Sequence, residues 1–300
     1  MSPEFINALN ECWERGGWWQ QVVEDKDLIL GIRDESLNVY YGGASLIRVD
    51  FRGGRIRAQT HYKYLVTSPE AGDYVSFLVG TSGQLEPVAG GGGAQISPNE
   101  LRELKSNARA HSGEEKSGVH KIALSNRVGV LDLEVAFVAV GGDASQASSE
   151  EHSDDGGTLD RIDLAVLEAK TEHPRLIFFE AKHFTNKELR SSRPAPPVFE
   201  QLERYEEDLV HYSGQIKETY QRVASNLLAL TGKIQTNDER RGLLEKTVEK
   251  LEIDTRPQLL VFGFDDDQKK GDAWARHSAK LEAHFKGRYH VRGDPSGFRL

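Results

Sequence analysis

The chain is poor in cysteine, which limits the kinds of stabilising and metal-binding sites it can contain. Cys12 is the only cysteine among 300 residues. A single thiol excludes an internal disulfide framework and a cysteine-rich zinc site. It also fits a reducing compartment, in which free thiols persist. We therefore expect a chain of this length to be held together by its apolar core alone.

Long apolar runs are also missing from the sequence. No segment approaches the ~20 consecutive apolar residues that a membrane-spanning helix needs. The first residues, MSPEFINALNECWERGG, lack the apolar core of a signal peptide. Hydrophobic residues make up 38% of the chain, an ordinary share for a globular protein. The sequence therefore predicts a soluble, cytoplasmic protein.

Basic residues are outnumbered by acidic ones. The chain has 38 lysines and arginines against 47 aspartates and glutamates, which gives a formal net charge of −9. This balance argues against a protein that coats nucleic acid by bulk charge. It does not exclude an enzyme that holds a metal ion with carboxylates and reaches nucleic acid through a local basic patch.

Two stretches of small and polar residues divide the chain. AGGGGA at 89–94 has no side chains that could pack in a core, and GGDASQASSEEHSDDGGT at 141–158 is small, polar and acidic. We expect an α+β N-terminal domain over residues 1–88 and a linker over 89–96. A second domain would follow over 97–300, carrying a mobile acidic loop at 141–158.

The N-terminal region has the pattern of a helix followed by an antiparallel meander. Ser2 is a suitable helix cap before Pro3, which suits a first helical turn. Three alternating segments, 37–41, 44–52 and 55–61, are joined by two Gly-Gly pairs, which are typical of tight hairpins.

Four arginines gather on this predicted meander. Alternation puts Arg48 and Arg52 on one face of the middle strand, and Arg55 and Arg57 share a face of the next strand. Asp50 is the acidic residue among them. We interpret the arginines as a surface that contacts the phosphate backbone of nucleic acid. A solvated sheet face, or a surface for a homodimer, remains the alternative.

The second region mixes helices and strands in an order that predicts a mixed α/β sheet. A capping box over Ser97–Glu100 predicts a helix over about 98–111. The other expected elements are strands at 128–140, 159–169 and 175–184, a long helix from Val198 past Leu227 to Gly232, a helix at 238–251, a strand at 258–264, a helix at about 273–286 and a strand at 288–292.

Two acids and a lysine are expected to converge on two of these strands. Glu180 and Lys182 point the same way because side chains two apart share a strand face. Asp163 lies on the preceding strand, across a short turn. Two converging carboxylates repel unless a cation lies between them, and Mg²⁺, or Mn²⁺ in its place, suits such a site. A nearby lysine can orient water or stabilise charge on a phosphate.

These residues resemble the motif of the PD-(D/E)xK nuclease superfamily, in which an acid on one strand precedes Glu-x-Lys on the next. Here the two parts are RID at 161–163, with isoleucine in place of the family's proline, and FEAK at 179–182. On the following helix, Gln201 and Tyr205 resemble the Gln-x-x-x-Tyr motif of the RecB-like branch. The resemblance covers about residues 98–264 and implies a restriction-endonuclease-like core of helix, three strands, helix and strand.

The resemblance also implies roles for individual residues. Asp163, Glu180 and the backbone carbonyl of Ala181 would bind the metal, and Lys182 would position the nucleophilic water. Many family members add an acid earlier in the chain. Glu134 is the preferred candidate because it would neighbour Asp163 across the sheet.

Other residues remain open as additional site residues. Glu103, Glu114 and Glu115 are alternative candidates for the upstream acid. The RecB-like branch has an upstream histidine, for which His111 or His120 could serve, although neither lies in a recognisable motif.

Structural explanations for the same residues remain alongside the catalytic one. A plain ion pair between acid and lysine would explain Asp163, Glu180 and Lys182, because carboxylates in apolar strands need partners. A solvated helix face would explain Gln201 and Tyr205. Isolated Glu-x-Lys carries little weight, since a second copy begins at Glu168.

The function implied by the resemblance is that of a magnesium-dependent deoxyribonuclease, an endonuclease or exonuclease that acts in defence against foreign DNA or in DNA repair. The alternative is a non-catalytic protein that binds nucleic acid or assembles complexes on a nuclease-like fold, because fold does not guarantee function. The presence of all three of Asp163, Glu180 and Lys182 favours the enzyme.

Overall fold

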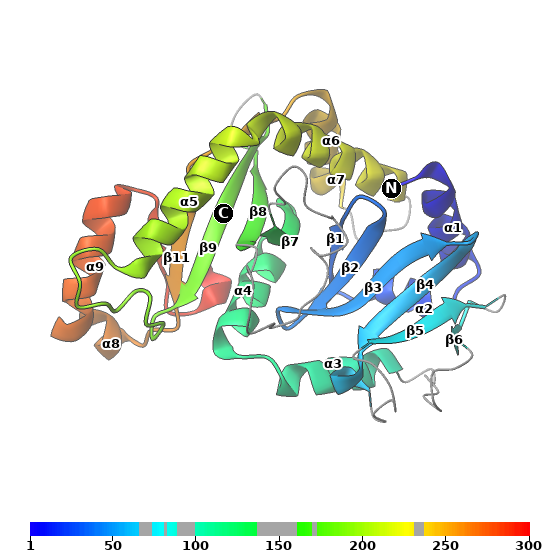
Figure 1. Ribbon diagram of the computed structural model, residues 1–300, viewed down its shortest axis with the longest axis horizontal. Coiled ribbons are helices and arrows are strands. Elements are labelled where there is room, and N and C mark those ends of the chain that lie inside the picture. The colour runs from blue at the N-terminus through cyan, green and yellow to red at the C-terminus, as the bar shows by residue number, and fades with distance from the viewer. Residues whose placement is uncertain (66–73, 81–82, 89–99, 137–160, 170–172, 231–236) are drawn as a thin grey trace.

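The structure is a computed structural model that describes residues 1–65, 74–80, 83–88, 100–136, 161–169, 173–230 and 237–300 (Figure 1). Within these ranges the chain has a mixed α/β fold with one antiparallel sheet, one mixed sheet and nine α-helices. The predicted linker at 89–96 and the predicted acidic loop at 141–158 lie outside the described residues.

The antiparallel sheet has the strand order β1-β2-β3-β4-β5-β6. Its strands are β1 (Ile29–Ile32), β2 (Ser36–Tyr41), β3 (Ala44–Arg52), β4 (Arg55–His61), β5 (Tyr74–Val79) and β6 (Leu85–Pro87). The predicted meander is β2, β3 and β4, and both Gly-Gly turns are present. Gly53 and Gly54 have φ of 57° and 74°, a conformation that a two-residue hairpin of this kind requires. The other three strands were not predicted.

The register of β3 against β4 brings the four arginines to one face. Asp50 pairs with Arg57, and Arg52 pairs with Arg55. Arg48 pairs with Gln59. Because directly opposed residues of an antiparallel pair lie on the same face, the predicted gathering of the arginines is confirmed.

Two short helices, α1 (Pro3–Glu14) and α2 (Trp18–Glu24), complete the N-terminal part of the chain. Ser2 caps α1 as predicted: its Oγ accepts a hydrogen bond from Phe5 N at 3.4 Å. Phe5, Leu9 and Trp19 are fully buried, so these helices contribute apolar side chains to the core.

The mixed sheet has the strand order β12-β11-β9-β8-β7, and β10 pairs with β9 beside this path. Its strands are β7 (Val130–Ala136), β8 (Arg161–Glu168), β9 (Arg175–His183), β10 (Glu252–Ile253), β11 (Gln258–Phe262) and β12 (Tyr289–Val291). β7, β8 and β9 are antiparallel neighbours, whereas β11 pairs in parallel with both β9 and β12. Each strand except the short β10 lies within a predicted strand.

The helices of this part are α3 (Glu100–Ala110), α4 (Glu114–Ser125), α5 (Pro197–His211), α6 (Ser213–Leu230), α7 (Asp238–Glu249), α8 (Asp266–Lys270) and α9 (Asp272–Phe285). Helices α4 and α8 were not predicted, and the capping residues proposed for α3 before Glu100 lie outside the described residues. No helix in the described ranges is both long enough and apolar enough to cross a membrane.

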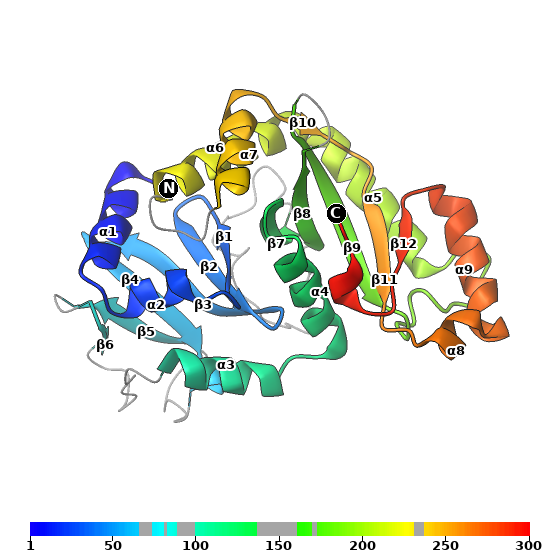
Figure 2. The ribbon, with the colours of Figure 1, turned by 180° about the vertical axis from the view of Figure 1, so that it is seen from behind.

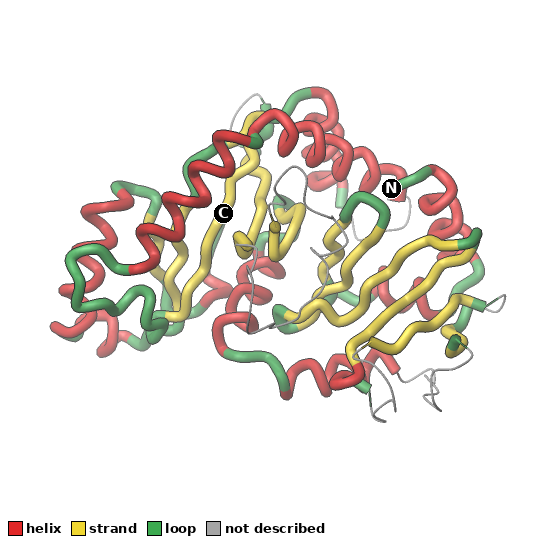
Figure 3. Tube along the Cα trace, viewed as in Figure 1, coloured by secondary structure: helices red, strands yellow, loops and turns green. Residues whose placement is uncertain are grey.

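The prediction of one long helix from Val198 past Leu227 is wrong, because the chain breaks at Tyr212. Tyr212 has φ −98° and ψ 10°, and the pair Ser213-Gly214 follows it. Serine and glycine are poor helix formers and often mark kinks. The break lets α5 follow the mixed sheet while α6 continues towards the antiparallel sheet, as Figure 3 shows. The predicted end of the helix at Gly232 lies outside the described residues.

Helices α4 and α5 lie on opposite faces of the mixed sheet (Figures 1 and 2). Leu202 of α5 belongs to the same core cluster as Phe178 of β9, whereas Ile122 of α4 packs in a second cluster with Phe179. The first cluster also includes Leu46 of β3, so it is shared by both sheets. Alternating residues of β9 therefore face α5 and α4 in turn.

Candidate functional site

The pairing of β8 with β9 brings Asp163 and Glu180 together. Leu164 pairs with Phe179, so the next position of each strand puts Asp163 opposite Glu180. Asp163 Oδ2 accepts a hydrogen bond from the backbone N–H of Ala181 at 2.8 Å. The register of the two strands and this hydrogen bond therefore place the two acids side by side.

Lys182 lies between two carboxylates. Its Nζ is 2.8 Å from Glu180 Oε1 and 2.8 Å from Glu188 Oε2. Glu180 and Lys182 are 3% and 7% exposed, so most of this ion pair is shielded from water. Burial lowers the pKa of Lys182, but the charges of Glu180 and Glu188 outweigh it and raise that pKa well above its ordinary value. The ammonium therefore stays charged.

The two acids are harder to ionise than ordinary carboxyl groups. Burial raises the pKa of Glu180 from 4.5 to about 7, with Lys182 opposing and Glu115 and Glu188 adding to the rise. Burial, followed by the charge of Glu180, also raises the pKa of Asp163 well above its ordinary range. Two carboxylates this close, with little water around them, repel each other, and a cation between them would relieve the repulsion.

Helix α5 extends the cluster through two side chains spaced one turn apart. Gln201 Nε2 donates to Glu180 Oε1 at 3.1 Å and to the Tyr205 hydroxyl at 2.8 Å. The Tyr205 hydroxyl donates to the backbone carbonyl of Arg161 at 2.7 Å. Tyr205 is only 1% exposed, so the alternative of a solvated helix face does not describe it. The two residues instead connect β8 to the acid on β9.

The oxygen donors of the cluster suit a small divalent cation. The carboxylates of Asp163 and Glu180 and the carbonyl of Ala181 are hard ligands of the kind that Mg²⁺ prefers. Glu180 Oε2 is buried and has no hydrogen-bond partner among the described residues. Within the same residues, no three histidine, cysteine, aspartate or glutamate side chains form a metal-binding group. A site of two carboxylates completed by water is consistent with both observations, because Mg²⁺ commonly uses one or two carboxylates.

Glu134, the preferred upstream acid, lies in an irregular part of β7. It falls between Leu133 and Val135, whose partners on β8 are Leu164 and Ile162, the neighbours of Asp163. Its φ is 51°, a left-handed conformation that is uncommon for a residue with a side chain. Its carboxylate is 4.0 Å from Lys116 Nζ. A role for Glu134 in metal binding stays a prediction.

Glu115, one of the alternative acids, has direct contacts beside the cluster. Its Oε2 accepts hydrogen bonds from the backbone N–H of His183 at 3.0 Å and from Asn186 Nδ2 at 2.9 Å. Its charge contributes to the raised pKa values of Asp163 and Glu180. The unpredicted helix α4 therefore brings an acid towards the end of β9.

The remaining upstream candidates, Glu103, Glu114, His111 and His120, differ in their surroundings. Glu103 is exposed on α3, and Glu114 is exposed at the start of α4. His120 is buried, with Nε2 2.8 Å from the backbone carbonyl of Asp27. His111 lies edge-on to a tyrosine ring. The carboxylate of Glu114 is 3.7 Å from His183 Nε2 at the end of β9, whereas the contacts of His111 and His120 are with Tyr64 and with the backbone of Asp27.

The four arginines of the antiparallel sheet differ in their environments. Arg57 Nε donates to Asp50 Oδ1 at 2.9 Å, and its Nη2 contacts the other oxygen of the same carboxylate. Arg52 Nε is 3.7 Å from Asp50, and Arg55 is exposed near the hairpin turn. Arg48 is half-buried, and its Nε lacks a hydrogen-bond partner among the described residues. Contact with nucleic acid stays a prediction for all four.

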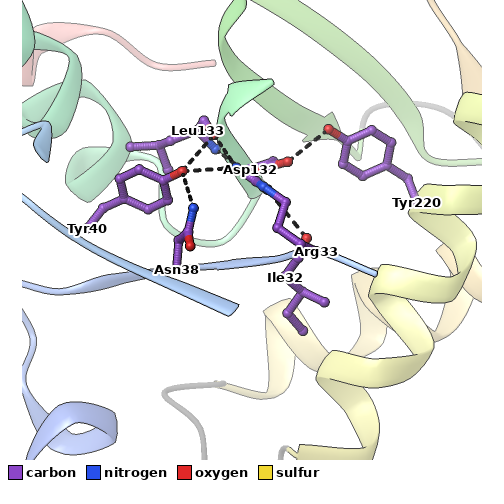
Figure 4. A network of polar contacts seen from close by, with 7 residues as sticks. All are labelled: Ile32, Arg33, Asn38, Tyr40, Asp132, Leu133 and Tyr220. Atoms are coloured by element: carbon purple, nitrogen blue, oxygen red, sulfur yellow. Dashed lines mark hydrogen bonds and ion pairs between the residues drawn. The ribbon is translucent and has the colours of Figure 1, made fainter. Parts of the chain in front are cut away.

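A buried polar network that the sequence did not reveal joins the two sheets (Figure 4). Arg33, just after β1, forms an ion pair with Asp132 of β7 and donates to the Tyr40 hydroxyl at 2.9 Å and the Leu133 carbonyl at 2.8 Å. The Tyr220 hydroxyl of α6 donates to Asp132 Oδ2 at 3.2 Å. Burial disfavours the charged form of Arg33, but Asp132 outweighs it and raises the pKa of Arg33.

The available sequence signal for this network is a single acid within an otherwise apolar strand. Asp132 is 6% exposed and therefore needs a partner, yet Arg33 lies 99 residues away in the chain. Nothing local to either residue indicates the pairing.

Comparison with known proteins adds no relative: no family model matches the chain, and neither a curated protein nor a solved structure is detectably similar to it.

Proposed function

We propose that the chain is a magnesium-dependent deoxyribonuclease built on a restriction-endonuclease-like core of the PD-(D/E)xK type. The observation that carries the proposal is the facing pair Asp163 and Glu180 on adjacent strands, with Lys182 on the same strand face as Glu180. Their geometry joins a shielded pair of acids to a lysine whose ammonium lies 2.8 Å from Glu180. These are the parts that hydrolysis of a phosphodiester requires.

The acids would hold the divalent ion, together with the carbonyl of Ala181. A bound Mg²⁺ supplies positive charge against the scissile phosphate and makes water more acidic. The raised pKa values of Asp163 and Glu180 support this role, because both carboxylates are poorly stabilised without a cation.

Lys182 would act as a hydrogen-bond donor. Its raised pKa keeps the ammonium protonated, so it is suited to hold the attacking water or a phosphate oxygen and unsuited to accept a proton. Gln201 and Tyr205 would be positioning residues: one fixes an oxygen of Glu180, and the other fixes the backbone of β8 two residues before Asp163.

The arrangement of the mixed sheet is consistent with the proposed core. Three antiparallel strands, β7 to β9, are extended by the parallel β11, and helices α4 and α5 cover opposite faces. The acids lie at the pairing of the second and third of these strands. For the upstream acid, the contacts of Glu115 favour it over Glu134.

The proposal is tested by DNA cleavage. Supercoiled plasmid and labelled single-stranded DNA are incubated with the protein in Mg²⁺, in Mn²⁺ or in EDTA, and wild type is compared with Asp163→Asn. Glu200→Gln is the matched control, because Glu200 is an exposed acid on α5 next to Gln201. We expect cleavage by wild type and control in either metal, and a loss of about a thousandfold or more in Asp163→Asn.

Two results would contradict the proposal. Wild-type protein that binds DNA but never cleaves it would favour the non-catalytic alternative. Cleavage by Asp163→Asn at the wild-type rate would show that the reaction does not take place at Asp163, Glu180 and Lys182. The two substrates also distinguish the kind of cleavage. Nicking of the closed plasmid indicates an endonuclease, whereas digestion of the labelled single strand from its end indicates an exonuclease. A cytoplasmic location and a role in defence or repair stay part of the proposal.

A further inference from the structure

Basic side chains from two segments gather where the loop after β9 meets helix α9. The loop, residues 184–196, runs beside α9 in both ribbon views (Figures 1 and 2). Lys280 Nζ donates a hydrogen bond to the backbone carbonyl of Arg193 at 2.9 Å, so the two segments are in direct contact. We call the basic residues of the loop and of the first half of α9 the loop–α9 patch: Lys187, Arg190, Arg193, Arg276 and Lys280.

Buried apolar side chains hold both segments in place beneath the patch. The ring of Phe184, the first residue after β9, lies 4.7 Å from that of Phe264 between centroids, and the ring of Trp274 on α9 lies 4.8 Å from that of Phe264. All three rings are buried, and so is Leu189 of the loop, whereas Arg190 next to it is exposed. The patch is therefore a solvent-facing surface on a packed base.

Neighbouring acids do not balance the patch. Within the described residues, no carboxylate forms an ion pair with any of its five members. Glu188, the acid of the loop, contacts Lys182 instead. Exposed acids at the starts of α8 and α9 form no ion pair with the patch in this part of the chain either: Asp265, Asp266, Asp267 and Asp272. Because the whole chain has a net charge of −9, this positive surface is a local feature.

His277 of α9 shows that the positive charges lie close to one another. Burial, followed by the charges of Arg190, Lys280 and Arg276, lowers the pKa of His277. Its Nδ1 is buried and has no hydrogen-bond partner among the described residues. Like charges from two segments repel each other, and an anion placed over them would relieve that repulsion.

The patch differs in charge from the cavity of about 560 Å³ that Arg48 lines between the two sheets. The charged residues of that cavity are Arg33, Arg48, Arg161, Asp34, Glu35, Asp132 and Glu134. Carboxylates outnumber arginines there, so the cavity has no excess of positive charge. The patch has such an excess and is open to solvent, which suits a long polyanion.

The patch begins next to the proposed catalytic cluster. Glu188 Oε2 is 2.8 Å from Lys182 Nζ, and Arg190 follows Glu188 by two residues. Two residues span at most about 7 Å of chain, so Arg190 starts within this distance of Glu188. A strand whose scissile phosphate lies at Lys182 could therefore bring its next phosphates to the patch.

We propose that the loop–α9 patch binds the phosphate backbone of DNA beside the scissile phosphate. The planar fork of arginine suits phosphate oxygens, and contacts of this kind position a strand without reading its sequence. The inference rests on the proposed nuclease function for the identity of the polyanion as DNA. It assigns affinity to the patch and cleavage to Asp163, Glu180 and Lys182.

DNA binding in EDTA tests the inference without involving catalysis. A short fluorescently labelled duplex is titrated with the full chain at several KCl concentrations, and anisotropy gives the affinity. Wild type is compared with the double variant Arg190→Ala/Arg276→Ala, which removes one charge from each segment. The matched control is Arg102→Ala/Arg222→Ala, which removes two exposed arginines from α3 and α6. Thermal unfolding of each variant shows that it is folded.

We expect the patch variant to bind the duplex about tenfold or more weakly than wild type at low salt. Its log–log salt slope should fall by about 0.9 for each lost phosphate contact, and the control should stay within about twofold of wild type. Absence of DNA binding by wild type, or the same affinity and slope in patch and control variants, overturns the proposal. If sedimentation then shows that only the patch variant loses self-association, the surface belongs to a second copy of this chain.

Cleavage in Mg²⁺, measured on the same variants, separates this inference from the proposed function. Weaker binding by the patch variant, with no cleavage by wild type, would support the binding surface and contradict the nuclease function. Cleavage by wild type, with unchanged binding by the patch variant, would support the nuclease function and contradict the binding surface.

Discussion

Gln201 Nε2 lies 3.1 Å from Glu180 Oε1, so the helix that follows the Glu-x-Lys strand reaches back to its acid. The same amide group also donates to Tyr205, whose hydroxyl is bonded to the backbone of β8. One side chain thus couples the orientation of the acid to the strand that carries Asp163.

This coupling predicts different effects for the two residues of α5. Gln201→Ala should lower the cleavage rate by about ten- to a hundredfold while changing stability little, because the hydrogen bond to Glu180 orients a ligand of the metal. Tyr205→Phe should lower the free energy of unfolding by about 1–3 kcal/mol, since the carbonyl of Arg161 loses a buried donor. Cleavage kinetics and urea unfolding measure the two effects. Equal loss of stability in both variants would argue that the pair is purely structural.

The raised pKa of Glu180 predicts that metal affinity depends on pH near neutrality. The pKa of this group rises from 4.5 to about 7 on folding, so the folded state holds its proton more tightly. Mg²⁺ needs the carboxylate, and its affinity should therefore rise as the pH increases from 6 to 8, by up to about tenfold per pH unit below the pKa.

Stability of the metal-free protein should change in the opposite direction. Between pH 4.5 and 7 the folded state carries more protons at Glu180 than the unfolded state, so the free energy of unfolding in EDTA falls as the pH rises through this window. In Glu180→Gln, the free energy of unfolding in EDTA should fall less steeply as the pH rises. Metal titrations at pH 6 and 8 that give the same affinity would show that this carboxyl is not a ligand.

The ion pair of Arg33 and Asp132 predicts a non-additive pair of substitutions. Arg33→Met leaves a buried carboxylate without its cation and should lower the free energy of unfolding by about 3 kcal/mol. The double variant Arg33→Met with Asp132→Leu should recover most of this loss. Arg241→Met is the control, because its ion pair with Glu245 is exposed and is worth only about 0.5 kcal/mol. If the losses of unfolding free energy in the two single variants add up in the double variant, the two charges act independently.

The arginines of the antiparallel sheet should separate into structural and surface residues. Arg57→Ala removes both contacts to the buried carboxylate of Asp50 and should cost about 1–3 kcal/mol in urea unfolding. Arg52→Ala with Arg55→Ala should leave stability within about 0.5 kcal/mol. If these two contact phosphates, the double variant should reduce the log–log salt slope of DNA binding by about 0.9 for each lost contact. An unchanged slope would leave this part of the sheet as a surface for a protein partner.

Local patterns in the sequence were sufficient for much of the fold. The hairpins of β2, β3 and β4 follow from alternation and from glycine pairs that permit positive φ, and these signals involve neighbouring residues only. The convergence of Asp163 with Glu180 follows from strand spacing and a short connection. Helix α4 escaped prediction because EEKSGVHKIALS has glycine in its middle and a weak apolar stripe. Because α4 was not predicted, the position of Glu115 near the end of β9 was not predicted either.

Long-range contacts account for the features that could not be predicted. Arg33 meets Asp132 across 99 residues, and the cavity that Arg48 lines is formed by segments from both sheets. The break at Tyr212 escaped prediction because apolar spacing continues through it, and Ser213-Gly214 is only a weak signal. Pairings of this kind depend on how the sheets pack, which the local pattern of either segment does not specify.

The most direct test of the account is a calorimetric titration of the metal-free protein with Mn²⁺ at pH 8. The central claim is that the repelling acids Asp163 and Glu180 hold a divalent cation. We predict saturable binding by wild type, loss of about a hundredfold or more in affinity for Asp163→Asn and Glu180→Gln, and wild-type affinity in the control Glu200→Gln. Glu115→Gln and Glu134→Gln, measured alongside, identify which upstream acid contributes. Absence of binding by wild type, or unchanged affinity in Asp163→Asn, would contradict the claim.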